Sequence, residues 1–198
     1  MQTGKQTMRE ENDRQRGQSL AELALVMPLL LMILVAMVEV GWAMRSHLIV
    51  TTASREAARF AARRVFDYAE IDEVAEVALL SLNPVYDGAD ANTTIIITKV
   101  QIDAAGNWSI DGGQPYVNGD LPVDTRIEDT TYDQIAADNV VFNTAHSGID
   151  SENNVVVVEV FYDHELLLGS RIASGWMGLG PLRLYSRSIS RIGVSRYE

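Results

Sequence analysis

The sequence predicts an α+β fold in which a long N-terminal helix, half in a membrane and half beyond it, packs on a small antiparallel β-sheet. Three observations support this class. Residues 20–44 are almost continuously apolar, and residues 45–82 contain neither proline nor glycine. Three stretches typical of strands follow, at residues 93–102, 155–162 and 183–194. A helix that precedes a group of strands is a pattern of α+β domains.

The apolar run is long enough to cross a membrane once. No charged residue lies between Leu23 and Val38, and at about 1.5 Å per residue the run 20–44 exceeds the ~30 Å of a hydrocarbon core. A cleaved secretory signal is the alternative, but its apolar region would be shorter and would end in a small-residue cleavage site. Pro28 inside the run predicts a kink, and Trp42 near its end predicts an interfacial anchor.

Two carboxylates, Glu22 and Glu39, lie within this run. They are about 25 Å apart along a helix, so they cannot both lie at one membrane face. One interpretation places them at the two headgroup layers, where water solvates them. This interpretation is favoured for Glu39, whereas the residues that precede Glu22 indicate another role. Basic residues lie before and after the run, so their count leaves the orientation open.

A glycine and a short hydrophilic leader with several basic residues, residues 1–17, precede Glu22. The order of leader, Gly17 and an apolar helix with glutamate at its fifth position resembles the processing signal of type IV prepilins. The resemblance implies cleavage by a prepilin peptidase between Gly17 and Gln18. Cleavage would leave a positive α-amine on Gln18, which Glu22 could neutralise within the chain or from a neighbouring subunit.

The longer segment 17–64 resembles the TadE-like family of minor pilins or pseudopilins of tight-adherence (Tad, type IVc) systems. The features that carry it are "LALVMPLLL" after Glu22, "VEVG" near the end of the run, and "ASREAARFAARR". The resemblance implies a pilin-like fold and a subunit that assists assembly of a pilus or secretion machine with other pilin or pseudopilin subunits. It also implies a single pass through the bacterial inner membrane, with a cytoplasmic N-terminus and an exported C-terminal domain. The subunit would be located in that membrane or in a surface pilus.

A second interpretation comes from a different class: an uncleaved single-span membrane protein whose exported domain binds a ligand or partner. The mature N-terminus separates the two interpretations. In both, the predicted domains are a leader at 1–17, a transmembrane helix at 18–44, an exported helical stalk at 45–82 and a β-rich exported domain at 83–198.

The stalk carries two stripes of side chains. Arg55, Arg59 and Arg63 recur every four residues and therefore share one face of a helix, while a series of alanines forms another stripe. The arginine stripe fits either a subunit contact or a solvated face. A break near residues 66–68 stays open, so one long helix or two helices in tandem fit the segment 45–82.

The acidic segment 111–150 is rich in Asp, Gly, Asn and Pro, and it predicts a long surface loop with a short helix at 132–138. Four of its acids could bind calcium, but their spacing matches no EF-hand loop, and a solvated insertion is favoured. The four acids are Asp120, Asp124, Glu128 and Asp129.

The composition argues against several functions. A formal net charge of −11 disfavours nucleic-acid binding, and the absence of cysteine excludes thiolate chemistry. The tripeptide Asp163-His164-Glu165 follows the predicted strand 155–162. Neighbouring side chains of an extended chain point to opposite sides, so a convergent site is not expected. No common catalytic motif is present. The sequence therefore predicts no enzyme, no catalytic or metal site and no cofactor; an anchored hydrolase that depends on His164 is a third option.

Overall fold

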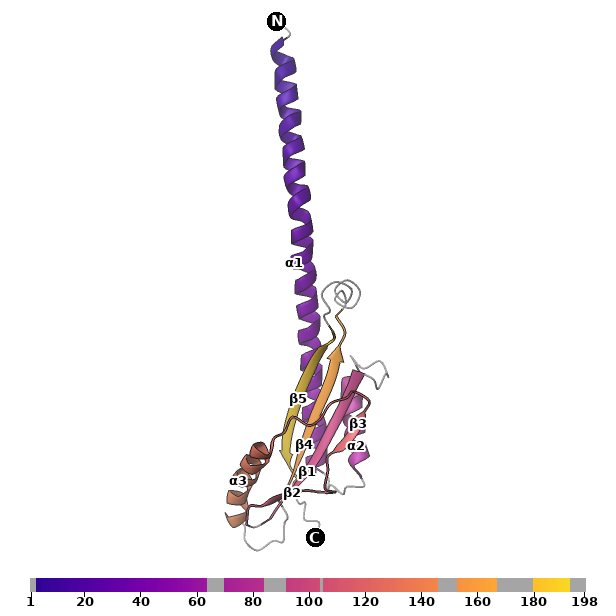
Figure 1. The fold of residues 1–198 in the computed structure, drawn as a ribbon, viewed down its shortest axis with the longest axis vertical. Helices are drawn as coiled ribbons and strands as arrows, with labels where there is room; N and C mark the ends of the chain where they lie inside the picture. Colours follow the sequence, from indigo (N-terminus) through magenta and orange to yellow (C-terminus); the bar gives the residue numbers. More distant parts are fainter. Residues whose placement is uncertain are drawn as a thin grey trace. The chain divides into compact units, whose positions relative to one another are not determined.

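The computed structural model describes residues 3–63, 70–83, 92–103, 105–145, 153–166 and 180–192, and for 3–19, 139–145 and 153 it describes the backbone alone. The chain divides into two compact units, Met1–Trp42 and Ala43–Glu198. The first unit consists of the N-terminal part of helix α1 (Thr3–Arg63). The second unit contains the remainder of α1 and every other described element (Figure 1).

The second unit is built on one antiparallel sheet. Its strands are β1 (Thr93–Ile102), β2 (Trp108–Ile110), β3 (Tyr116–Gly119), β4 (Asn153–His164) and β5 (Leu182–Arg191). Helix α2 (Ile71–Leu82) precedes β1 in the chain, and helix α3 (Asp129–Ala145) lies between β3 and β4. The strand order is β2-β1-β4-β5, and β3 pairs with the first half of β1 on the same side as β2. The α+β class with a long N-terminal helix and a small antiparallel sheet is confirmed.

The two central strands are buried on both faces. Ile95 and Ile97 of β1 pack with alternate valines of β4 against α1 and α2, and this side of the sheet is called the helix-side face. Val100 and Ile102 of β1 point to the opposite face, where they pack with Val155 and Val157 against residues after β3. Because alternate residues of a strand face opposite sides, each run of β-branched residues supplies two core layers at once.

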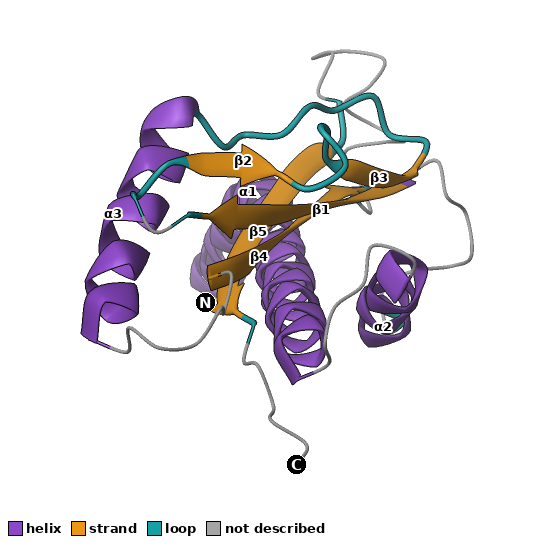
Figure 2. Ribbon diagram, turned by 90° about the horizontal axis from the view of Figure 1, so that it is seen from below, coloured by secondary structure: helices purple, strands orange, loops and turns teal. Residues whose placement is uncertain are grey.

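The opposite face is covered by residues 121–136, here called the cover segment. Figure 2 shows the connection between β3 and α3 on one side of the sheet and α1 and α2 on the other. Leu121 and Ile127 of the connection are buried, as are Tyr132 and Ile135 of α3. The cover segment is therefore the layer on the opposite face, and the sheet lies between this segment and the helices α1 and α2.

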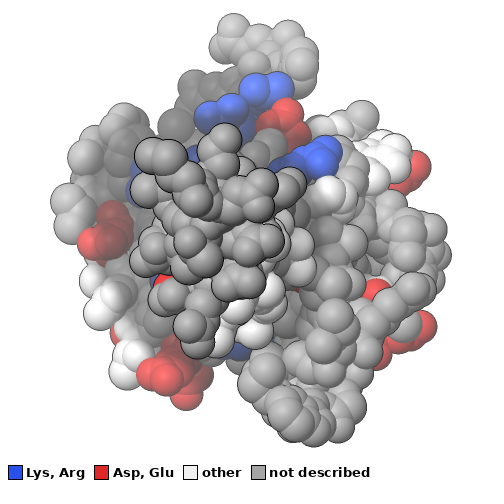
Figure 3. Space-filling model, turned by 90° about the horizontal axis from the view of Figure 1, so that it is seen from above, with Lys and Arg blue, Asp and Glu red and all other residues white. Residues whose placement is uncertain are grey.

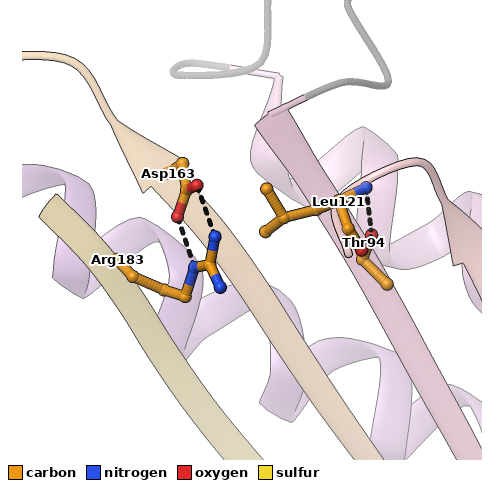
Figure 4. Close-up of polar contacts among 4 residues, drawn as sticks. All are labelled: Thr94, Leu121, Asp163 and Arg183. Atoms are coloured by element: carbon orange, nitrogen blue, oxygen red, sulfur yellow. Dashed lines mark hydrogen bonds and ion pairs between the residues drawn. The ribbon is translucent and has the colours of Figure 1, made fainter. Parts of the chain in front are cut away.

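A glycine and a threonine direct the chain into the cover segment. Gly119 has φ +119°, and a Cβ added there would lie 2.2 Å from the carbonyl oxygen of Thr93, so only glycine fits this close approach. Two residues later the backbone N–H of Leu121 donates to Oγ1 of Thr94 at 2.9 Å, and that hydroxyl donates to the carbonyl oxygen of Leu121 at 3.1 Å (Figure 4). The pair fixes the start of the cover segment on β1.

The segment 111–150 differs from the expected long loop. It contains β3, and it contains the 17-residue helix α3 where a short helix at 132–138 was expected. The apolar residues of this segment are few, but Ile127, Tyr132 and Ile135 are spaced so that all three reach the sheet. Residues 66–68, where the sequence left a helix break open, lie outside the described residues; α1 is described to Arg63 and α2 from Ile71.

Candidate processing and assembly segment

The apolar part of α1 is exposed along its length. Large side chains from Leu20 to Met44 lie open to the surroundings, with exposed fractions of 80% at Leu25 and 71% at Met37. Within the described part of the chain, α1 from Leu20 onward is the single helix long and apolar enough to cross a membrane, judged by length and composition. Contact with water would forgo about 25 cal/mol for each Å² of apolar surface, so hydrocarbon or another apolar partner is the favoured surrounding.

The predicted processing residues all lie on α1. Gly17 and Gln18 are within the helix, and Glu22 is an exposed residue of it. Glu22 is four positions after Gln18, which places the two residues about one turn apart on the same helix face. The helix thus brings the predicted new terminus and the predicted acid to one side.

The other predicted residues of this helix are spread along it. The helix continues on both sides of Pro28, Glu39 is half-buried, and Trp42, the last residue of the first unit, is 45% exposed. The structure does not bring Glu39 or Trp42 together with Glu22, because Glu39 is 17 positions after Glu22 and therefore about 25 Å away along the helix. The roles predicted for Pro28 as a kink and for Trp42 as an anchor stay predictions.

In the second unit the same helix changes character. Ala53, Ala57 and Ala61 are completely buried against the sheet, whereas the predicted arginines are exposed on the other side of the helix. The arginines are Arg55, Arg59 and Arg63. Alanine lets a helix approach a sheet closely, so the alanine stripe is the packing face and the arginine stripe is directed away from the core. Both stripes were visible in the sequence.

A hydroxyl pair joins this packing face to the edge strand. Oγ of Ser54, on α1, lies 2.9 Å from Oγ of Ser186, on β5, and both serines are buried. The Ser54 hydroxyl is also within 3.0 Å of the carbonyl oxygen of Thr51, a local bond that a helical serine commonly makes. The pair satisfies two polar groups in a core that is otherwise apolar at this point.

Sequence reasoning missed a buried carboxylate at the centre of the opposite face. Glu159 of β4 is completely buried and accepts three hydrogen bonds: from the Thr125 hydroxyl at 2.5 Å, the Arg126 backbone N–H at 3.0 Å and the Tyr185 hydroxyl at 2.9 Å. Burial, followed by the nearby Glu159 carboxylate, raises the pKa of the Tyr185 phenol. The signal was a single acid inside the apolar run 155–162.

Arg126 completes the attachment of the cover segment. Its guanidinium carbon lies 5.7 Å from the ring centre of Phe161 and 4.9 Å from that of Tyr185, within the range of cation–π attraction. Together with the bonds to Glu159, this contact fixes the cover segment to β4 and β5. The cluster is an intramolecular anchor, in which every oxygen of Glu159 already has a donor.

The tripeptide at the end of β4 does not converge. Asp163 accepts two hydrogen bonds from the guanidinium of Arg183, at 2.7 and 2.8 Å, across the β4–β5 pair (Figure 4). His164 is buried on the helix-side face, with its ring 6.3 Å from that of Tyr162. The two side chains form an ion pair, and the hydrogen bond from Arg183 to Asp163 raises the pKa of the guanidinium. Among the described residues no group of three or more His, Asp or Glu side chains is placed to hold a metal ion.

These features define a class: an α+β protein with one apolar N-terminal helix, which is consistent with a single-pass membrane protein. Residues 17–59 match the family model described as TadE-like protein, and this confirms the resemblance inferred from the sequence for that segment. The match begins at Gly17 and lies wholly on α1. It supports a pilin-like role associated with a Tad pilus. Neither the curated proteins nor the solved structures give a match to this chain.

Proposed function

We propose that this chain is a minor pilin-like or pseudopilin-like subunit that assists assembly of a Tad-type pilus or secretion machine. It is inserted once in the bacterial inner membrane with residues 1–17 on the cytoplasmic side and the second unit exported, and it is not an enzyme. The observation that carries the proposal is the TadE-like match, which begins at Gly17, just before the apolar run of α1. The expected partners are the membrane, a prepilin peptidase and other pilin or pseudopilin subunits.

Processing would take place at the peptide bond between Gly17 and Gln18. Hydrolysis of this bond adds one water, leaves a carboxylate on Gly17 and frees the α-amine of Gln18. Glycine lowers helix stability by about 1 kcal/mol relative to alanine, so the helix opens more readily at Gly17 than at its neighbours, as a protease requires. The new α-amine, with a usual pKa of about 7.7–8.0, is largely protonated at neutral pH.

Glu22 would then neutralise that charge. After cleavage the helix begins at Gln18, and Glu22 follows one turn later on the same face. A carboxylate near the N-terminus of a helix is favoured by about 0.3–1 kcal/mol through the helix dipole alone. In a low-dielectric membrane the attraction to an ammonium is stronger, and it offsets the cost of moving either ion out of water. The acid of one copy can equally pair with the amine of a neighbour.

The first test is the mature N-terminus. We expect mass spectrometry of membrane-extracted protein from a host with an active prepilin peptidase to find Gln18 as the first residue. Gly17→Val should block this cleavage because a branched side chain restricts the backbone at the cut. Gly41→Val is the matched control, since a Cβ at Gly41 meets nothing within 4 Å and the position is far from the cut. An intact Met1 end in the unsubstituted chain would contradict the proposal and favour the uncleaved single-span protein.

The second test concerns assembly. Glu22→Ala should leave cleavage largely intact but reduce recovery of the chain with its partner subunits, because the new ammonium then has no carboxylate at this position. Glu39→Ala removes the other acid of the same apolar run and should have a smaller effect. Co-purification after mild solubilisation measures the recovery. Equal incorporation of the Glu22 variant and the unsubstituted chain would refute the role given to Glu22.

A further inference from the structure

Two exposed surfaces of opposite charge lie on opposite sides of the sheet. Arg55, Arg59 and Arg63 form the arginine face of α1, with one acid, Glu56, among them. Residues 120–138 carry six carboxylates and one arginine, and all six acids are exposed. The arginine, Arg126, lies over the Phe161 and Tyr185 rings. The acids, here called the acidic surface, are Asp120, Asp124, Glu128, Asp129, Asp133 and Asp138.

The sheet prevents these two surfaces from meeting within one chain. The alanines of α1 pack on the helix-side face, so the arginine face points away from the sheet there. The cover segment packs on the other face through Ile127, Tyr132 and Ile135, so its acids point outward in the opposite direction. Figure 2 shows the two layers on either side of the strands. Figure 3 shows most of the visible basic atoms toward the upper edge and most acidic atoms elsewhere on that surface.

Lipid headgroups are a poorer match for the arginine face. The apolar run ends at Met44, and Arg55, Arg59 and Arg63 follow it by about 16, 22 and 28 Å along a helix. Electrostatic attraction to a surface falls off within about 8–10 Å at physiological salt. Unless the helix lies flat, the arginines are beyond the reach of the headgroups, whereas a neighbouring acidic protein surface can follow the stripe along its length.

We propose that the arginine face of one copy binds the acidic surface of a second copy of this chain. The contact rests on the proposed function and deepens it, because it names the surface of the neighbouring subunit. It is heterologous: each copy contributes a different surface and keeps one of each free for the next copy. Heterologous contacts that do not close on themselves generate open helical arrays, which is the symmetry a filament needs.

The contact is tested by cross-linking, because the natural chain contains no cysteine. Thr52→Cys places a thiol on the exposed side of α1 beside Arg55, and Thr130→Cys places one in the first turn of α3 beside Glu128. We expect a short bis-maleimide to link copies of the full-length double variant in membranes into dimers and larger products. The control pairs Thr52→Cys with Gln114→Cys, an exposed position outside the acidic surface, and should give at least about fivefold less product.

Charge reversal decides the pairing. Arg55→Glu with Arg59→Glu should lower the yield at least fivefold, as should Asp124→Lys with Glu128→Lys. Asp133 is left unchanged, because its carboxylate accepts a hydrogen bond from the Trp108 indole N–H at 2.8 Å. Combining both reversals in one chain should restore the cross-linking yield to within about twofold of that without charge reversals. High salt should lower the yield of the chain without charge reversals. Failure of the combined variant to recover would overturn the proposal.

The same samples separate this inference from the proposed function. If Gln18 is the first residue and the chain is recovered with partner subunits, but neither reversal changes the yield, the copy-to-copy contact is wrong and the function stands. If Met1 is retained and no partner is recovered, the function fails. A loss caused by the arginine reversal alone, accompanied by loss of binding to vesicles of anionic phospholipid, would assign the arginines to headgroups and overturn the contact.

Discussion

The two stretches of α1 place their side chains in opposite ways. Residues 20–44 carry Leu, Met, Ile and Val, and nearly all of these are exposed, whereas residues 46–61 bury Ser and Ala together with Val50. Within one helix the larger apolar side chains are outside and the smaller ones are inside. Hydrophobicity alone therefore does not decide burial in this protein; the decisive factor is whether a partner surface lies within the chain.

The size of the buried residues explains how the second stretch packs. A helix that buries Ala57, Ala58 and Ala61 can approach the valines of β4 closely, and close packing maximises dispersion contacts. The first stretch has the composition expected where hydrocarbon or neighbouring helices supply the packing. The contrast predicts that substitutions in the two stretches change different properties of the protein.

The largest effect is expected from a charge in the apolar stretch. Leu34→Arg, at a position that is 61% exposed, should weaken membrane retention because an arginine at the centre of a membrane helix costs about 2.5–3.5 kcal/mol. The fraction that stays in the membrane pellet after alkaline extraction measures this effect. Leu48→Arg is the matched control, with 66% exposure but in the second unit, and it should leave retention unchanged. Equal membrane retention of both variants would contradict the assignment of residues 20–44, and not residues 46–61, to the membrane.

An intermediate effect is expected from overpacking the second stretch. Ala57→Leu adds three carbons at a completely buried position and should lower the free energy of unfolding of the second unit by about 1–3 kcal/mol. Glu56→Leu, an exposed neighbour, should change it by less than about 0.5 kcal/mol. Thermal unfolding of full-length protein in detergent, followed by near-UV circular dichroism, gives both values. An Ala57 variant as stable as the Glu56 variant would show that α1 does not pack on the sheet through this face.

The smallest effect is a pH dependence confined to the second unit. The raised pKa of Tyr185 means that folding favours the protonated phenol, so its contribution is complete below about pH 10 and is lost as pH rises toward the folded-state pKa. Tyr185→Phe removes the hydrogen bond to Glu159 and should cost about 1 kcal/mol at neutral pH. Above about pH 10 the free energies of unfolding of the unsubstituted chain and of the Tyr185→Phe variant, plotted against pH, should converge. Curves that stay parallel up to about pH 12 would contradict this origin of the shift.

The sequence predicts the parts of the fold that depend on local pattern. The runs of β-branched residues give β1 and β4, and the alternation after residue 182 gives β5. The alanine and arginine stripes also follow from helical spacing alone. These features are predictable because residues near in sequence decide them.

The cover segment and its anchor are not predictable in this way. Few apolar residues occur between 111 and 150, so the segment has the composition of a loop. Its position depends on contacts of Thr125 and Arg126 with residues more than 30 positions away, such as the one acid in β4. Sequence patterns do not report such pairings. The processing and assembly roles of Gly17, Gln18 and Glu22 stay predictions that depend on the family resemblance and on the chemistry of the new terminus.

The buried alanine face of α1 determines where the chain can be shortened. The TadE-like match ends at Arg59, and residues 43–59 form one wall of the α+β core although most of that core lies outside the match. A water-soluble version that starts after Arg63 would leave α2 but not α1 on Ile95, Ile97 and the valines of β4, and the part of this face that α1 covers would be exposed and prone to aggregate. A version that starts at Ala43 keeps the part of α1 that packs on the sheet and omits most of the apolar run. The boundary for a soluble fragment therefore falls inside a single helix.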